Sequence, residues 1–194
     1  MDPNLPTNPE LKKIWEDYEK EYLFHLNFLK AKAPDNLWLF NKFVLEAEKG
    51  DVNFVPLAPF HKELCHFVTD QKDQKKLILI PRSHLKSKLI TVGYPIQQIV
   101  KNPKIRILIY SATWSTAADL VASIQKTLQS CTKILEIWGD LSIGTREWSQ
   151  DKIRLADNDK REATVTAAGI DNNLVGGHYD LIIMDDVVNR DNVG

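Results

Sequence analysis

The chain of 194 residues contains little cysteine and glycine, has almost no net charge and lacks long apolar runs. Its two cysteines, Cys65 and Cys131, are too few for a disulfide framework, which fits a reducing compartment. No apolar stretch approaches the roughly 20 residues of a membrane-spanning helix. Residues 1–10 also lack the basic and then apolar build of a secretory signal. We therefore expect a soluble intracellular protein with no membrane partner.

The net charge of −1 gives the whole chain no attraction to nucleic acid, but the charge is unevenly placed. Residues 72–106 hold a single acid, Asp73, and nine basic residues: Lys72, Lys75, Lys76, Arg82, Lys86, Lys88, Lys101, Lys104 and Arg106. This stretch carries +8 and the remainder −9. A basic middle indicates either a local anionic partner, such as phosphate, or a solvated basic face. Contact with a DNA backbone at residues 72–76 and 101–106 is a further possibility that the sequence leaves open.

The first 50 residues predict a helical extension. Thr7 or Asn8 can cap a helix, with Pro9 in its first turn. Apolar and aromatic residues then recur on one face, at Leu11, Ile14, Trp15, Tyr18 and Tyr22. Because aromatics at helical spacing are more typical of packing than of base stacking, we predict that this face lies in the core. A second helix is predicted from Leu37 along a stripe that includes Ala47, with Gly50 as its stop.

From residue 51 onward, short apolar segments predict the strands of an α/β domain. Segments 77–80 and 181–184 are fully apolar and 105–110 is apolar apart from Arg106, which is typical of buried parallel strands. Segments 153–156 and 163–167 are weaker strand candidates. A short helix is predicted near residues 60–68, and another from Thr116, where Asp119 has the spacing of a capping box. The alternation predicts a mainly parallel sheet flanked by helices.

The first predicted strand runs into Pro-Arg-Ser-His-Leu-Lys-Ser at residues 81–87, just before a helical segment. A helix N-terminus offers unpaired N–H groups to phosphate. Lys86 can reach the β- and γ-phosphates of a nucleotide, and the Ser87 hydroxyl can ligate Mg²⁺. The strict pattern G-x-x-x-x-G-K-[ST] is not met, because Ile80 and Leu85 stand at its glycine positions. The alternative is an ordinary strand-to-helix turn with a surface lysine.

Two adjacent acids, Asp185 and Asp186, follow the last apolar segment. Ligands bind at the carboxyl ends of strands in open α/β sheets. Asp185 is suited to hold Mg²⁺ through its hydration shell, and Asp186 to orient an attacking water and accept its proton. The Lys86-Ser87 loop or the Asp185-Asp186 pair alone is weak evidence for a nucleotide site. The order of both motifs along the chain, with strands and helices between them, is more specific.

Four segments together resemble the ATPase domain of phage terminase large subunits, the motors that package viral DNA. They are the loop at 81–87, the segment 54–64 before it, Tyr-Ser-Ala-Thr at 110–113, and 169–186, which leads into Asp185 and Asp186. The resemblance covers about residues 37–194. It implies a P-loop NTPase of the ASCE type over residues 51–194, after an N-terminal helical segment at 1–50, with Mg²⁺ and ATP as cofactors.

The resemblance also implies roles for individual residues. Lys86, Arg82 and Asp186 match catalytic positions, and Ser87 and Asp185 match metal ligands. The nucleotide-binding positions are Phe60, His61, Arg82, Ser83, His84, Leu85, Lys86 and Ser87. Among these, His84 is interpreted as a filler of the loop, and the segment containing Phe60 and His61 lies near the adenine. Asp186 stands where many members have glutamate.

As a terminase, the chain is expected to power translocation of double-stranded DNA into a procapsid. Its partners would be the portal protein, the terminase small subunit and further copies in a ring, in the cytoplasm of the infected bacterial host at the procapsid portal. A neighbouring subunit would supply an arginine, with Arg146, Arg154 and Arg161 as candidates.

Two departures from the family are visible. Ser111-Ala112-Thr113 resembles a coupling motif but precedes the acidic strand, so we interpret it as the end of a strand. The ATPase domain is expected to be incomplete at its C-terminus, without the nuclease domain. The alternatives are a helicase-like, nucleic-acid-dependent ATPase and a non-hydrolysing nucleotide-binding assembly module.

Overall fold

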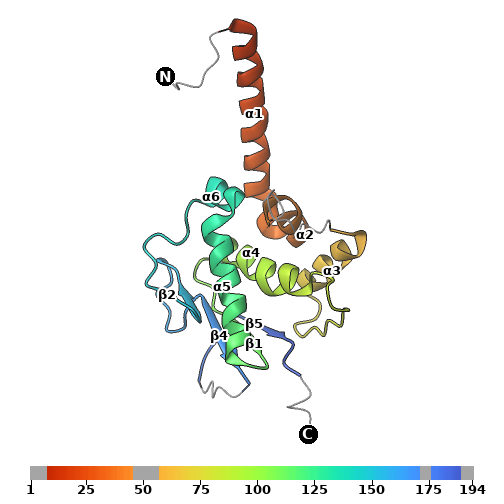
Figure 1. Cartoon of the computed structure of the whole chain (residues 1–194), viewed down its shortest axis with the longest axis vertical. Coiled ribbons are helices and arrows are strands. Elements are labelled where there is room, and N and C mark those ends of the chain that lie inside the picture. Colours follow the sequence, from red (N-terminus) through yellow and green to blue (C-terminus); the bar gives the residue numbers. More distant parts are fainter. Residues whose placement is uncertain (1–7, 46–56, 171–175, 189–194) are drawn as a thin grey trace.

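The computed structural model describes residues 8–45, 57–170 and 176–188. Helices pack beside a sheet, and the long first helix projects from this body (Figure 1). The helical elements are α1 (Pro9–Lys32), η1 (Ala33–Asp35), α2 (Leu37–Leu39), η2 (Phe40–Leu45), α3 (Pro59–Thr69), η3 (Ser87–Gly93), α4 (Tyr94–Lys101), α5 (Trp114–Ser130) and α6 (Thr132–Trp138). The strands are β1 (Ile107–Ser111), β2 (Glu147–Ser149), β3 (Lys152–Arg154), β4 (Val165–Gly169) and β5 (Leu181–Asp185).

In the described part of the chain, the five strands form one sheet in the order β2-β3-β4-β1-β5. β1 lies parallel to β4 on one side and to β5 on the other, whereas β2 and β3 join the sheet in antiparallel pairings. The predicted α/β class is confirmed, with a mixed sheet whose three neighbouring parallel strands are β4, β1 and β5. In this register Ser111 is paired with both Gly169 and Asp185, so three carboxyl ends meet at one edge.

One apolar cluster joins the sheet to the helices. Ile107 and Ile109 of β1 are fully buried with Val121 and Ile124 of α5. Phe40, in the helical segment before residue 50, belongs to the same cluster. The π-helical η2 and the N-terminal part of the chain therefore share a core with the sheet.

The predicted strand at residues 77–80 is wrong, because this segment belongs to no strand or helix among the described residues. Leu77 and Leu79 are 79% and 83% exposed, while Ile78 and Ile80 pack against a small cluster around Leu64. A strand needs a neighbour to pair its backbone groups, and residues 77–80 are not part of the described five-stranded sheet.

The predicted burial of the last apolar strand is only half right. In β5 the side chains alternate, so that Ile183 and Asp185 are buried whereas Ile182 and Met184 are exposed. The reason is that β5 is an edge strand of the described sheet and is covered on one face only.

The prediction that the aromatic face of the first helix lies in the core is also wrong. α1 projects away from the sheet (Figure 1), and Leu11, Ile14, Trp15 and Tyr18 are exposed. Leu29, near its end, is the buried residue of this helix. Helical spacing defines a face, but the projecting half of α1 has nothing to pack against in the described chain.

The ends of several elements differ from the sequence predictions. Asn8 caps α1 by accepting hydrogen bonds from the backbone N–H groups of Glu10 and Leu11, whereas Thr7 lies outside the described residues. α5 begins at Trp114, not at Thr116, because the Thr113 side chain accepts from the Thr116 N–H. The capping box with Asp119 is therefore wrong. Ala47 and Gly50, predicted to belong to and end the second helix, lie outside the described residues.

Other predictions are confirmed with small shifts. α3 matches the helix predicted near residues 60–68, and β1, β3 and β4 match three of the predicted strands. Ser111 ends β1, as we interpreted the Ser-Ala-Thr segment. None of the described helices is long and apolar enough to cross a membrane.

Candidate phosphate-binding site

The predicted phosphate lysine and the two predicted acids meet at the carboxyl end of β5. The Nζ atom of Lys86 lies 2.9 Å from Oδ1 of Asp185 and 2.6 Å from Oδ1 of Asp186. Lys86 immediately precedes η3, and Asp186 is 100 residues later in the chain. The fold therefore brings together the two halves of the motif that the sequence places far apart.

Asp185 is buried and held from several sides. Thr91 donates a hydrogen bond of 2.9 Å from Oγ1 to the carboxylate, and the Ser111 hydroxyl donates one of 2.8 Å to the Asp185 main-chain oxygen. Burial raises the pKa of the carboxyl, but hydrogen bonds from Ser87, Lys86 and Thr91 outweigh it and lower the pKa. Asp185 is consequently an anion near neutral pH, in a fixed orientation.

Lys86 is held in its charged form by the same contacts. Burial lowers the pKa of its ammonium group, but the hydrogen bonds to Asp186 and Asp185 outweigh that effect and raise the pKa. Asp186 differs from Asp185, because its side chain is 74% exposed and its backbone has a left-handed φ of 46°. The site thus combines one buried carboxylate, one exposed carboxylate and one cation.

The loop before Lys86 adopts backbone conformations that favour glycine, although it contains none. Ser83 has a φ of 67° and Leu85 a φ of 57°. Each such residue costs on the order of 1 kcal/mol when it is not glycine. Leu85 stands at a position where the strict phosphate-loop pattern has glycine, so the left-handed backbone is present there despite the departure in sequence. Loop strain of this kind is common at ligand sites.

His61 and Phe60 also reach the loop. His61 is buried in the first turn of α3, where its Nδ1 accepts a 2.8 Å hydrogen bond from the Ala58 N–H. Its Nε2 lies 3.2 Å from the carbonyl oxygen of His84. The Phe60 ring lies 3.9 Å from the His61 ring and 5.9 Å from the His84 ring, measured between centroids. His61 is therefore occupied with backbone atoms on both sides.

The remaining loop residues are exposed. Arg82 has no ion-pair partner among the described carboxylates, and its carbonyl oxygen lies 2.8 Å from Nδ1 of His84. Ser83 is exposed as well. The guanidinium of Arg82 is thus available to an anion, as its predicted role requires.

The predicted metal ligands fit Mg²⁺. A hydrogen bond joins the Ser87 side chain to the Asp185 carboxylate, so the two predicted ligands are already neighbours. Mg²⁺ prefers oxygen ligands and completes its shell with waters and phosphate oxygens. In residues 8–45, 57–170 and 176–188, no three His, Cys, Asp or Glu side chains gather as a metal cluster. The oxygen set fits magnesium better than a transition metal.

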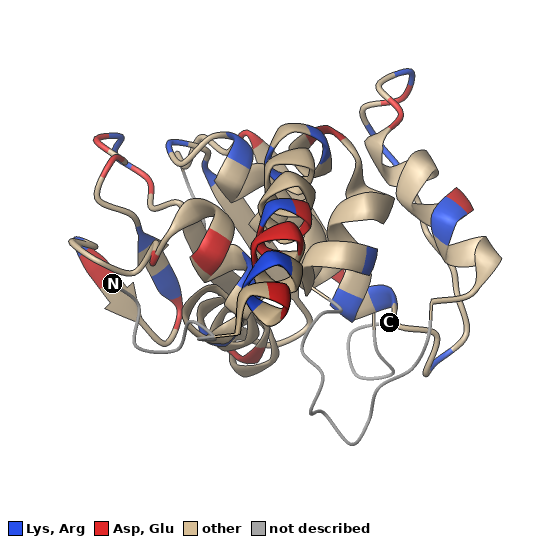
Figure 2. Cartoon of the chain, turned by 90° about the horizontal axis from the view of Figure 1, so that it is seen from above, with Lys and Arg blue, Asp and Glu red and all other residues tan. Residues whose placement is uncertain are grey.

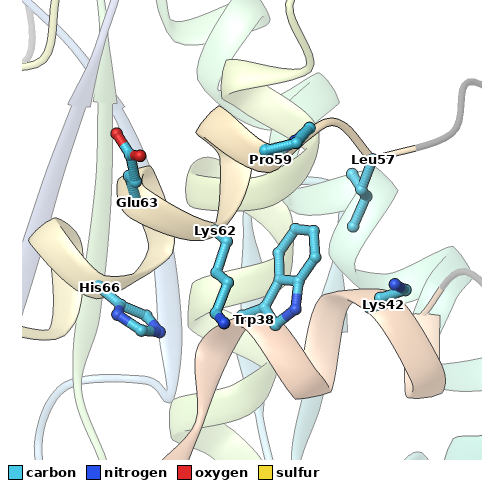
Figure 3. Close-up of a pocket in the computed structure, with 7 residues that line it drawn as sticks. All are labelled: Trp38, Lys42, Leu57, Pro59, Lys62, Glu63 and His66. Carbon is cyan, nitrogen blue, oxygen red and sulfur yellow. The ribbon is translucent and has the colours of Figure 1, made fainter.

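A separate hollow of about 600 Å³ lies beside α3 and contains none of the predicted site residues. It is lined by Trp38, Lys42, Leu57, Pro59, Lys62, Glu63 and His66. In the close-up, the Trp38 ring is seen between Lys62 and Lys42 (Figure 3). Because α3 also carries His61, this helix borders both the hollow and the loop.

Much of the basic stretch is neutralised within the chain. Lys101 pairs with Asp35, and the Lys104 ammonium lies 3.4 Å from the Asp159 carboxylate. Arg106 forms an ion pair of 2.7 Å with Asp180. Acidic and basic segments are interspersed when the molecule is seen from above (Figure 2). The basic stretch therefore forms no continuous basic face. Near the loop, the basic side chains without an ion-pair partner among the described residues are Arg82 and Lys88.

Thr91 and Ser111 are the site residues that the sequence reasoning missed. Thr91 follows Ser87 by four residues in a helical segment, and Ser111 is the polar residue that ends a buried strand. Once it is known that β1 and β5 are neighbours, both positions can be recognised as lying next to Asp185. Comparison with known protein families and with curated proteins finds no match to this chain.

Proposed function

We propose that the chain is a P-loop NTPase that binds and hydrolyses Mg-ATP, as the motor domain of a viral terminase large subunit that moves double-stranded DNA into a procapsid. The observation that carries the proposal is the contact of Lys86 with both Asp185 and Asp186. A loop lysine, a hydroxyl and two acids at a strand end are the groups that nucleotide hydrolysis needs.

Each residue has a distinct task in this proposal. Lys86, Arg82 and the loop N–H groups neutralise phosphate oxygens of ATP. Ser87 and Asp185 hold Mg²⁺, which supplies further charge neutralisation when bound. Asp186 orients a water and accepts its proton, while the water oxygen bonds to the γ-phosphorus and the bond to the β–γ bridging oxygen breaks. The products are ADP and phosphate.

The assembly implied by the resemblance is part of the same proposal. Further copies would form a ring around DNA, and an arginine from a neighbouring copy would complete each site. Of the three candidates, the guanidinium of Arg154 already donates to the main-chain oxygens of Lys160 and Arg161. Arg146 and Arg161 are therefore better suited to act across an interface.

The first experiment is calorimetric binding of Mg-ATP to the full chain. We expect Lys86→Ala and Asp185→Asn to weaken binding by about tenfold or more, because each removes a charged contact to the ligand. Lys88→Ala is the matched control, since Lys88 is an exposed lysine two residues away. A folded parent chain that binds no Mg-ATP, or a Lys86→Ala variant that binds like the parent, contradicts the proposal.

A second measurement separates the proposed motor from its alternatives. The Asp186 side chain is one methylene shorter than that of glutamate, and its carboxylate is paired with Lys86. Both features favour a non-hydrolysing nucleotide-binding module as the second candidate. Steady-state phosphate release distinguishes the two. Turnover stimulated by double-stranded DNA supports the motor, stimulation only by single or forked strands supports a helicase-like ATPase, and tight binding without turnover supports the module.

A further inference from the structure

The His61 ring joins the start of α3 to the phosphate loop. Its Nδ1 accepts from the Ala58 N–H at 2.8 Å, so this nitrogen carries no proton. In a neutral imidazole the other nitrogen is then the donor, and Nε2 lies 3.2 Å from the His84 carbonyl oxygen. These two contacts fix the tautomer and leave neither ring nitrogen for a nucleobase.

The contact falls at the most constrained point of the loop. His84 lies between Ser83 and Leu85, the two residues of this loop with left-handed backbones. Because a peptide unit is planar and trans, fixing the His84 carbonyl toward His61 directs the Leu85 N–H to the opposite side. Leu85 immediately precedes Lys86, so the same contact restrains the backbone that carries the phosphate lysine.

From this arrangement we infer that His61 is a positioning residue, which holds the phosphate loop in its ligand-binding form and does not contact the base. The inference rests on the proposed nucleotide binding, and it replaces the adenine contact that the family resemblance suggests for this residue. His61 is 3% exposed and reaches the loop only through the His84 carbonyl among the described hydrogen bonds.

Two uncharged substitutions separate the two contacts. In asparagine the amide oxygen lies the same number of bonds from Cα as Nδ1 of histidine, so His61→Asn can accept from the Ala58 N–H but does not reach His84. In glutamine the amide nitrogen lies as far from Cα as Nε2, so His61→Gln retains a donor for the His84 carbonyl. One neutral hydrogen bond is expected to change the binding constant by roughly three- to tenfold.

The test measures binding of Mg-ATP and Mg-GTP to the full chain and both variants, with the melting temperature of each. We expect His61→Asn to weaken both nucleotides by the same factor, roughly three- to tenfold, and His61→Gln to bind within about twofold of the parent. Parent-like binding by His61→Asn overturns the inference. A loss of affinity confined to ATP also overturns it, because it would indicate a contact with the base. An equal loss of affinity in both variants, together with equally lowered melting temperatures, overturns it as well.

A readout without nucleotide keeps this inference apart from the proposed function. Arg82 is exposed in the loop, so native-state trypsin cleavage after Arg82 reports how often the loop opens. We expect His61→Asn to be cleaved there roughly three- to tenfold faster than the parent and His61→Gln. If the parent binds no nucleotide but His61→Asn is still cleaved faster than the other two chains, the proposed function is refuted and the positioning role of His61 stands. Equal cleavage rates in all three chains refute the positioning role.

Discussion

Lys86 and Asp186 form an ion pair of 2.6 Å across 100 residues of sequence. The lysine that the proposed function assigns to phosphate is therefore already satisfied by a carboxylate of the same site. If the proposed function holds, the phosphate of a nucleotide would compete with this carboxylate for Lys86. Under the proposed function, each carboxylate near Lys86 would therefore compete with the ligand for this lysine as well as contribute to the site.

Asp186→Asn should separate affinity from turnover. Removing the exposed carboxylate frees Lys86 and removes a negative charge that repels phosphate, so we expect Mg-ATP to bind roughly two- to fivefold more tightly. Turnover should fall below detection, because the group that accepts the proton is lost. Calorimetry and phosphate release on the same preparation check both effects. Weaker binding by this variant would show that Asp186 contributes to holding the ligand.

The pH dependence of stability should carry the signature of Asp180. The ion pair with Arg106 holds the pKa of this carboxyl at about 2, below its ordinary value of 3.8. Because the pKa is lowered in the folded state, the pair stabilises the fold above about pH 4, and this contribution is lost as the pH falls toward 2.

Urea unfolding of the parent and Asp180→Asn at several pH values tests this expectation. The free energy of unfolding should differ between the two chains by a constant amount from pH 5 to 7, and the difference should disappear near pH 2. Asp157→Asn is the control, since no ion pair is described for Asp157. A difference that persists unchanged at pH 2 would rule out the ion pair as its cause.

Ser83→Gly should stabilise the chain. Ser83 is exposed and has a φ of 67°, a conformation that glycine adopts without strain. We expect the free energy of unfolding to rise by about 1 kcal/mol relative to Ser83→Ala, which retains the strain and also lacks the hydroxyl. Chemical denaturation of the two variants measures this. Equal stability of the glycine and alanine variants would contradict the left-handed backbone at this position.

The two halves of α1 should respond differently to truncation of their side chains. Leu29 is fully buried in the core, so Leu29→Ala is expected to lower the free energy of unfolding by about 2–5 kcal/mol. Ile14 is 65% exposed on the projecting half, and Ile14→Ala should change it by less than about 0.5 kcal/mol. Thermal and urea unfolding of both variants test the contrast. A large loss in Ile14→Ala would mean that the exposed face is covered in solution.

Local sequence patterns predicted those elements that depend only on neighbouring residues in the chain. The alternation of apolar blocks gave the α/β class, and the position of Asp185 after an apolar strand placed it at a carboxyl end. Lys86 and Asp185 were expected to meet because each was predicted to follow a parallel strand. They do meet, although residues 77–80 form no strand in the described sheet. Thr91 and Ser111 were missed, because their contacts with Asp185 depend on which strand neighbours which.

By itself, the sequence determined which faces are apolar and which chemical groups are available to a phosphate. Only the tertiary structure decided which of those faces are covered. Leu77 and Tyr18 lie in apolar patterns like those of core residues but remain exposed. Periodicity shows which face of an element is apolar, whereas burial also requires another surface to pack against it. His61 is the counterpart, a polar residue buried because two backbone groups, the Ala58 N–H and the His84 carbonyl, satisfy both of its nitrogens.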